Sequence, residues 1–258
     1  MSIGTSDFAT RNLDSIGAGL HSFKFIVKEF IDASYGGVSY STSSEKKYVL
    51  KTFIYMYEMS FIYEELNTLP IILCDHIIKE YENDDTKELG RVGVDRIVVT
   101  ALKKSLDLQF KIGSKWDAIH LTLREIVLKS LQKYYKHLND NVLHSIGGMG
   151  NILDPILGNQ TIMTGMQIQK YEVGDYFKWH IDGSKNTPQR ILAFIIYLNT
   201  MEDGCGGETE FIDGTIIRPE IGKLIFFPTT WTNIHRSVEI KSCSKYIITG
   251  FVLNSVSM

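Results

Sequence analysis

The stretch after Gly147 constrains the fold most, because it consists of short β-type runs separated by turn residues. Six runs are rich in β-branched and aromatic residues: Thr164 to Val173, Tyr176 to Ile181, Arg190 to Leu198, Glu208 to Ile212, Lys223 to Phe227 and Tyr246 to Leu253. Strands at such spacing are typical of a β-sandwich or barrel. No helical run separates them, which disfavours a parallel βαβ arrangement.

Two amphipathic runs upstream predict helices. Apolar residues recur at helical spacing from Leu73 to Tyr81, after Pro70, and a longer apolar stripe extends from Trp116 to Leu138. Between them, Arg96 to Thr100 and Leu106 to Phe110 have the composition of strands. Helices first and strands after predict a mainly β, α+β fold: a double-stranded β-helix, or jelly roll, buttressed by helices.

The length of 258 residues, 44% of them hydrophobic, is enough to bury one sizeable core. Residues 1–65 differ from the rest, because serine and glycine interrupt two aromatic-rich stretches, and we interpret them as an N-terminal extension of unknown role. Residues 66–258 are then one domain, with a core at 160–254. The domain is the part in which we expect the chemistry.

The charge balance, the cysteine content and the hydropathy pattern predict which partners the protein lacks and in which cellular environment it works. The 27 basic and 30 acidic residues leave a net charge of -3 without a long run of one sign, so we expect no nucleic-acid partner. The three cysteines form no C-x-x-C pair, which is typical of a reducing environment. The sequence shows no signal peptide and no apolar run of membrane-spanning length, which predicts a soluble, cytoplasmic protein without a membrane partner. Its oligomeric state stays open.

Four side chains suggest a metal site with an anion-binding lysine. His180 and Asp182 stand two apart at the end of a strand-like run, so both point to one face and could share a metal ion. His235 is the best third ligand, and two imidazoles with one carboxylate are the ligand set of non-haem iron(II) oxygenases. Lys245 opens an apolar run, where a buried ammonium needs an anionic partner. Taken singly, either histidine could be an ordinary core or surface residue, and Lys245 could be a snorkelling lysine with its ammonium in water.

The segment from Gln167 to Val252 resembles the catalytic core of the prolyl 4-hydroxylase type of 2-oxoglutarate dioxygenases. The resemblance rests on an ordered series of motifs: Gln167-Ile-Gln-Lys-Tyr171, Gly174-Asp-Tyr176, His180-Ile-Asp182, Arg190, Tyr197-Leu-Asn199, Gly206-Gly-Glu-Thr-Glu-Phe211, Gly222-Lys-Leu-Ile-Phe-Phe-Pro228, His235 and Lys245. Each motif is weak by itself, but their order makes the joint signal strong.

The resemblance implies that His180, Asp182 and His235 bind the catalytic Fe(II), and that Lys245 pairs with the C5 carboxylate of 2-oxoglutarate. Dioxygen is then the other cosubstrate and ascorbate the reductant. The implied reaction is hydroxylation of an unactivated C–H bond, and the implied substrate is a prolyl residue of a peptide or protein.

Four further positions take their interpretation from the same resemblance. Tyr171 and Tyr197 are implied to donate hydroxyl hydrogen bonds near the cosubstrate, and their alternative is packing as inward-facing aromatics. Arg190 matches a position near the substrate groove, and its alternative is a solvated charge. Phe251 stands where peptide-hydroxylating members commonly have tryptophan, which leaves the shape of a peptide groove open.

Other functions stay open at this point. The chain could hydroxylate a free amino acid or another small molecule, or it could be a jelly-roll binding module without turnover. A zinc hydrolase could use the same three ligands, but it does not explain Lys245. Gly206 and Gly207 predict a turn, in which glycine supplies a positive φ and lets the chain pass close to the metal side.

Overall fold

A computed structural model describes residues 61–254, except 94, 144–161 and 185. These residues belong to one compact unit that spans 57–258. The interpretation of residues 1–65 as an extension falls mainly outside the described part and stays a prediction. Its last residues form the strand β1 (Tyr63–Glu65), which pairs with a strand of the larger sheet.

Antiparallel strands form two sheets that face each other. The strands are β1, β2 (Glu88–Leu89), β3 (Lys103–Lys104), β4 (Leu106–Gln109), β5 (Ile162–Met163), β6 (Gln167–Tyr171), β7 (Tyr176–His180), β8 (Arg190–Tyr197), β9 (Thr209–Phe211), β10 (Ile216–Ile217), β11 (Leu224–Pro228), β12 (His235–Ser237) and β13 (Lys245–Leu253). The large sheet has the order β1-β11-β8-β13-β6-β4-β2, with β5 beside β13, and the small sheet has the order β10-β9-β12-β7-β3.

The large sheet has two differently used faces, because side chains alternate along a strand. On β13, Ile248 and Val252 belong to the cluster that packs against the helices. Ile247 belongs to the other cluster, which lies between the sheets. We call the face that carries Ile247, and with it Lys245 and Thr249, the inner face of the large sheet.

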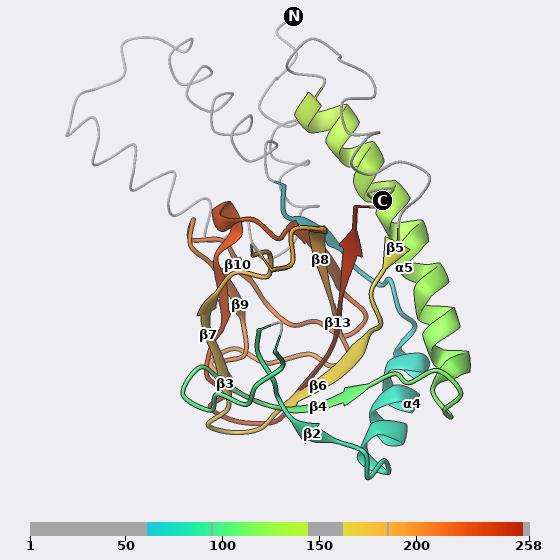
Figure 1. Cartoon of the computed structure of the whole chain (residues 1–258), viewed down its shortest axis with the longest axis vertical. Helices are drawn as coiled ribbons and strands as arrows, with labels where there is room; N and C mark the ends of the chain where they lie inside the picture. The colour runs from blue at the N-terminus through green and yellow to red at the C-terminus, as the bar shows by residue number, and fades with distance from the viewer. Residues whose placement is uncertain (1–60, 94, 144–161, 185, 255–258) are drawn as a thin grey trace, which may run out of the picture. The chain divides into compact units, whose positions relative to one another are not determined.

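Two helices, α4 (Ile71–Glu82) and α5 (Asp117–His137), cover the other face of the large sheet (Figure 1). A π-helical turn at Leu138–Leu143 continues α5. The Tyr134 ring of α5 stacks on Phe226 of β11, with centroids 5.6 Å apart. Each helix therefore buries one apolar stripe against the sheet. Within the described segments, no helix combines the length and the apolarity needed to cross a membrane.

The prediction of a mainly β, α+β jelly roll with buttressing helices is confirmed. The strand predicted at Arg96–Thr100 is wrong, because a single bridge between Val92 and Ile97 is the only pairing described there. Arg96 has a left-handed backbone, with φ 50°, and Ile97 and Val98 are exposed. Their β-branched side chains have no neighbouring strand to pack against, so the segment forms a turn.

Candidate metal centre

Strand pairing in the small sheet brings two histidines together. His235 begins β12 and lies directly opposite His180, the last residue of β7. Their ring centroids are 4.2 Å apart. Asp182 follows β7 by two residues, and its two carboxylate oxygens each lie 3.7 Å from a histidine Nε2. One ligand atom from each of the three residues therefore lies within 4.8 Å of the other two.

Both imidazoles are held with one ring nitrogen free for a metal ion. Nδ1 of His180 lies 2.8 Å from the carbonyl oxygen of Lys178, and Nδ1 of His235 lies 3.0 Å from that of Asn233. A carbonyl only accepts, so each Nδ1 must carry the proton and donate it. This tautomer leaves a lone pair on each Nε2, which faces Asp182.

Aromatic side chains surround the two histidines and exclude water from part of the site. The Phe177 ring stacks on His180 with a centroid distance of 3.5 Å, and Phe227 packs edge-on against His235 at 4.7 Å. Burial, with a smaller contribution from His235, lowers the pKa of His180 well below its usual value, so its imidazole is neutral. Burial also raises the pKa of Asp182, although His235 and Arg190 oppose the shift.

The donor set fits a divalent transition metal such as Fe(II). Two imidazole nitrogens and one carboxylate lie close together, which is the donor set of a facial triad. A cation at this position would favour the ionised form of Asp182, whose charge is otherwise disfavoured by burial. Three protein ligands would leave further coordination positions of such an ion for small molecules.

Lys245 is a buried cation without a carboxylate partner among the described residues. It is the first residue of β13 and is 1% exposed. Its Nζ donates hydrogen bonds to the carbonyl oxygen of Gly207, at 2.9 Å, and to the Ser237 hydroxyl. It also lies 4.6 Å from the centre of the Tyr171 ring. Burial lowers the pKa of Lys245 to about 7, although Glu208 partly opposes the shift.

Gly206 and Gly207 have positive φ values, 74° and 84°, which agrees with their predicted turn role. A Cβ on Gly206 would lie 2.1 Å from the Glu239 carbonyl oxygen, and one on Gly207 would lie 2.8 Å from Ile240 Cδ1 and 3.3 Å from Lys245 Cδ. The glycines therefore allow close approach to Lys245 and its neighbours. The expectation that they let the chain pass close to the metal side stays a prediction.

The remaining predicted site residues, Tyr171, Tyr197 and Arg190, have different partners. The Tyr171 hydroxyl donates to Gln169 Oε1 at 2.7 Å, and the Tyr197 hydroxyl lies 2.7 Å from Thr209 Oγ1. Burial raises the pKa of both phenols. The Arg190 guanidinium lies over the Phe251 ring and donates to the carbonyl oxygen of Asp182 at 3.2 Å. Arg190 is thus not a freely solvated charge.

Sequence reasoning missed a buried polar network beside the site. Lys103 and Asp107 form an ion pair of 2.7 Å, and their side chains are 1% and 9% exposed. Ser105 donates to the other carboxylate oxygen, and Lys103 lies 5.3 Å from the centre of the Phe177 ring. The network supports the ring that stacks on His180. The sequence did contain a signal for it: the polar residues Lys103, Ser105 and Asp107 are spaced two apart, which puts their side chains on one face of an extended chain.

Residues 166–253 match the sequence model of the 2OG-Fe(II) oxygenase superfamily. The matched segment contains the three candidate ligands and Lys245. These residues form a 2OG-Fe(II) oxygenase domain. The prediction of a 2-oxoglutarate-dependent dioxygenase is confirmed, and the family implies Fe(II), 2-oxoglutarate and dioxygen. No match was found among the curated proteins.

Solved prolyl hydroxylases share the fold of this oxygenase domain. A viral collagen prolyl hydroxylase from Paramecium Bursaria Chlorella virus-1 is 21% identical, with a TM-score of 0.50 over 75% of this chain and 96% of its own. A Trichoplax adhaerens prolyl hydroxylase, in complex with a peptide fragment of the hypoxia inducible factor oxygen degradation domain, is 14% identical, with a TM-score of 0.59 over 84% and 94%. A Pseudomonas putida prolyl-4-hydroxylase is 15% identical, with a TM-score of 0.52 over 76% and 94%.

Proposed function

We propose that the oxygenase domain hydroxylates an unactivated C–H bond of a prolyl residue in a peptide or protein. In this proposal His180, Asp182 and His235 hold Fe(II). Bound iron would supply the oxidative chemistry in which 2-oxoglutarate and dioxygen give succinate, carbon dioxide and a hydroxylated product, with ascorbate as reductant. The protein orients the reactants and keeps water away from them.

The single observation that carries the proposal is the buried ammonium of Lys245. It has hydrogen-bond acceptors but no carboxylate partner among the described residues, so a dicarboxylate bound beside it would supply the missing charge. The C5 carboxylate of 2-oxoglutarate would occupy this position while its keto acid end reaches the metal. A zinc hydrolase gives no reason for such a cation.

The two tyrosines are proposed to orient the same cosubstrate. Tyr171 lies against Lys245, and Tyr197 lies opposite Ile247, the next inner residue of β13. Because burial raises the pKa of both phenols, they stay protonated. Each would donate to a carboxylate by turning its hydroxyl away from its present partner, Gln169 Oε1 for Tyr171 and Thr209 Oγ1 for Tyr197.

Arg190 is proposed to contact the substrate beside the metal. Its guanidinium is held between the Asp182 carbonyl and the Phe251 ring, at a centroid distance of 3.9 Å. The assignment of a prolyl substrate draws on the prolyl hydroxylases that share the fold, one of which was solved with a peptide. Arg190 matches a family position near the substrate groove, and Phe251 stands where peptide-hydroxylating members commonly have tryptophan. We therefore place the substrate against the Arg190–Phe251 pair.

The proposal is tested by incubating the full chain with Fe(II), 2-oxoglutarate, ascorbate and a panel of proline-containing peptides under air. We expect succinate formation and a mass gain of one oxygen in at least one peptide. His180→Ala should abolish both, whereas His76→Ala, an exposed histidine of α4, should leave both unchanged. Bound iron without succinate formation on any peptide or amino acid would instead indicate a binding module.

A further inference from the structure

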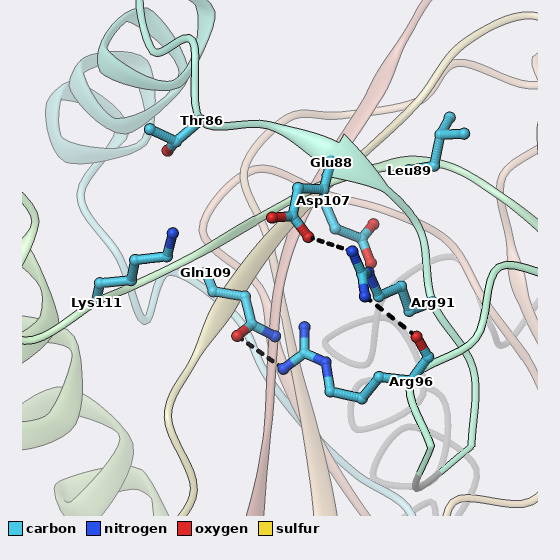
Figure 2. Close-up of a pocket in the computed structure, with 8 residues that line it drawn as sticks. All are labelled: Thr86, Glu88, Leu89, Arg91, Arg96, Asp107, Gln109 and Lys111. Carbon is cyan, nitrogen blue, oxygen red and sulfur yellow. Dashed lines mark hydrogen bonds and ion pairs between the residues drawn. The ribbon is translucent and has the colours of Figure 1, made fainter.

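A pocket lies against β2 and β4, and none of its lining residues is a candidate metal ligand (Figure 2). Its volume is about 250 Å³, below the few hundred Å³ typical of small-molecule sites. Three cationic side chains line it, Arg91, Arg96 and Lys111, together with the carboxylates of Glu88 and Asp107. We call it the Arg96 pocket. Its size fits one side chain better than a cofactor.

Two cations of the Arg96 pocket have no carboxylate partner among the described residues. Glu88 pairs with Arg91 at 3.0 Å, and Asp107 pairs with Lys103 at 2.7 Å. Arg96 donates instead to the neutral amide oxygen of Gln109 at 2.8 Å, as Figure 2 shows. Lys111 makes no ion pair within the described part of the chain. The pocket is therefore locally positive, although the whole chain has a net charge of -3.

The pocket opens on the same inner face of the large sheet that carries Lys245. Gln109 of β4 pairs in register with Gln167 of β6, and Gln167 pairs with Thr249 of β13. Gln109 Nε2 donates to Gln167 Oε1 at 3.3 Å, and Gln167 Nε2 donates to Thr249 Oγ1 at 3.5 Å. Gln109, Gln167 and Thr249 are all half-buried, so a ligand can reach this row of side chains, which we call the amide row.

The amide row continues to the metal centre. Phe251 is the next inner residue after Thr249 on β13, and Arg190 connects Phe251 with the backbone of Asp182. Phe251 on β13 and Gln109 on β4 are separated by two strand spacings and by two residues in register, or roughly 12 Å, which an extended chain covers in about four residues. A polypeptide bound at the metal can thus reach the pocket with a nearby residue.

We propose that the Arg96 pocket binds an acidic side chain of the polypeptide substrate, roughly four residues from the residue that reacts. The inference rests on the proposed function and adds the substrate class. A guanidinium binds a carboxylate through paired hydrogen bonds, and Lys111 adds a second positive charge. The amide row offers donors and acceptors to the main chain between the two sites.

The test uses two fluorescein-labelled peptides with one central proline. One peptide has glutamate at roughly three to five residues on each side of the proline, and the other has glutamine at the same places. Fluorescence anisotropy with the full chain, Mn(II) and 2-oxoglutarate measures binding without turnover. We expect the glutamate peptide to bind roughly fivefold more tightly at low salt, and the difference to shrink as salt is added.

The double variant R96Q/K111Q should remove the preference and leave the affinity for the glutamine peptide unchanged. The control R124Q/K129Q removes the same charges from exposed positions of α5, on the opposite side of the large sheet, and should keep the preference. The proposal is overturned if the wild type binds both peptides equally or binds neither. It is also overturned if the control variant R124Q/K129Q loses the preference for the glutamate peptide to the same extent as R96Q/K111Q. Failure of the proposed function would appear separately, as absent succinate formation.

Discussion

At the scale of single residues, the site depends on charges whose partners are supplied by other molecules. Lys245 is buried among a carbonyl, a hydroxyl and an aromatic ring, a setting that disfavours its charged form. Asp182 is likewise disfavoured as an anion by burial. A metal cation and a dicarboxylate would each bring the opposite charge, so binding and ionisation are coupled at both places.

The affinity for 2-oxoglutarate should therefore fall at alkaline pH. Burial lowers the pKa of Lys245 to about 7 in the free protein, and a bound carboxylate raises it again. Above about pH 7 binding must take up a proton, so we expect the affinity to weaken about tenfold per pH unit until the pKa of the complex is reached. Calorimetry with Mn(II) between about pH 7 and pH 9 measures this dependence.

An oxoacid without the distal carboxylate, 2-oxobutyrate, is the control, because it chelates the metal in the same way. The affinity for 2-oxobutyrate should not show the pH dependence that Lys245 causes. Lys245→Met should weaken 2-oxoglutarate binding and leave 2-oxobutyrate binding unchanged. Equal binding of 2-oxoglutarate by the variant and the wild type would contradict the assigned role of Lys245.

At the scale of elements, turns and short strands determine where the site residues lie. The turn at Gly206 and Gly207 brings the chain against Glu239 and Ile240, and the Gly207 carbonyl accepts a hydrogen bond from Lys245. The strand β12 is three residues long and still places His235 opposite His180. Such elements have little stability alone and depend on the strands they join.

Gly206→Ala should destabilise the fold more than Gly204→Ala. Both glycines have positive φ, 74° and 81°, so each substitution should cost about 1 kcal/mol or more in backbone strain. At Gly206 the new Cβ would also meet the Glu239 carbonyl oxygen at 2.1 Å, whereas the space at Gly204 is open. We expect a total loss above about 2 kcal/mol for Gly206→Ala, measured by urea unfolding. Equal losses in the two variants would contradict the close packing.

At the scale of the whole molecule, the metal centre joins segments that are distant in the chain. His180 ends β7 and Asp182 follows it by two residues, whereas His235 begins β12, after the intervening strands β8 to β11. A ligand that binds only this assembled site stabilises the folded state by mass action.

Mn(II) with 2-oxoglutarate should therefore raise the melting temperature. At a hundredfold excess over Kd the stabilisation is about 2.7 kcal/mol, which corresponds to an increase of roughly 5 to 10 °C for a domain of this size. His235→Ala should abolish the increase, and His76→Ala should keep it. Differential scanning calorimetry measures both, and an increase of the same size in His235→Ala would mean that the metal binds elsewhere.

The sequence by itself determined the types of element and the candidate ligands. Periodicity is a local property, so the helices after Pro70 and Trp116 and six strands of the oxygenase core, β6 to β9, β11 and β13, could be predicted from residues close in the chain. The His180-x-Asp182 spacing and the ordered motifs likewise predicted the oxygenase domain. These predictions depend on neighbours two to four positions apart, which any fold of the chain would keep.

Only the tertiary structure decided which distant groups meet. The register of β7 with β12, the partners of Lys245, and the Lys103–Asp107 pair beside Phe177 all depend on packing between separate elements. The same dependence explains why Arg96–Thr100, with strand-like composition, forms a turn: no strand lies beside it, and its arginine lines a pocket instead. Strand propensity describes a fit to neighbours, and neighbours are set by the fold.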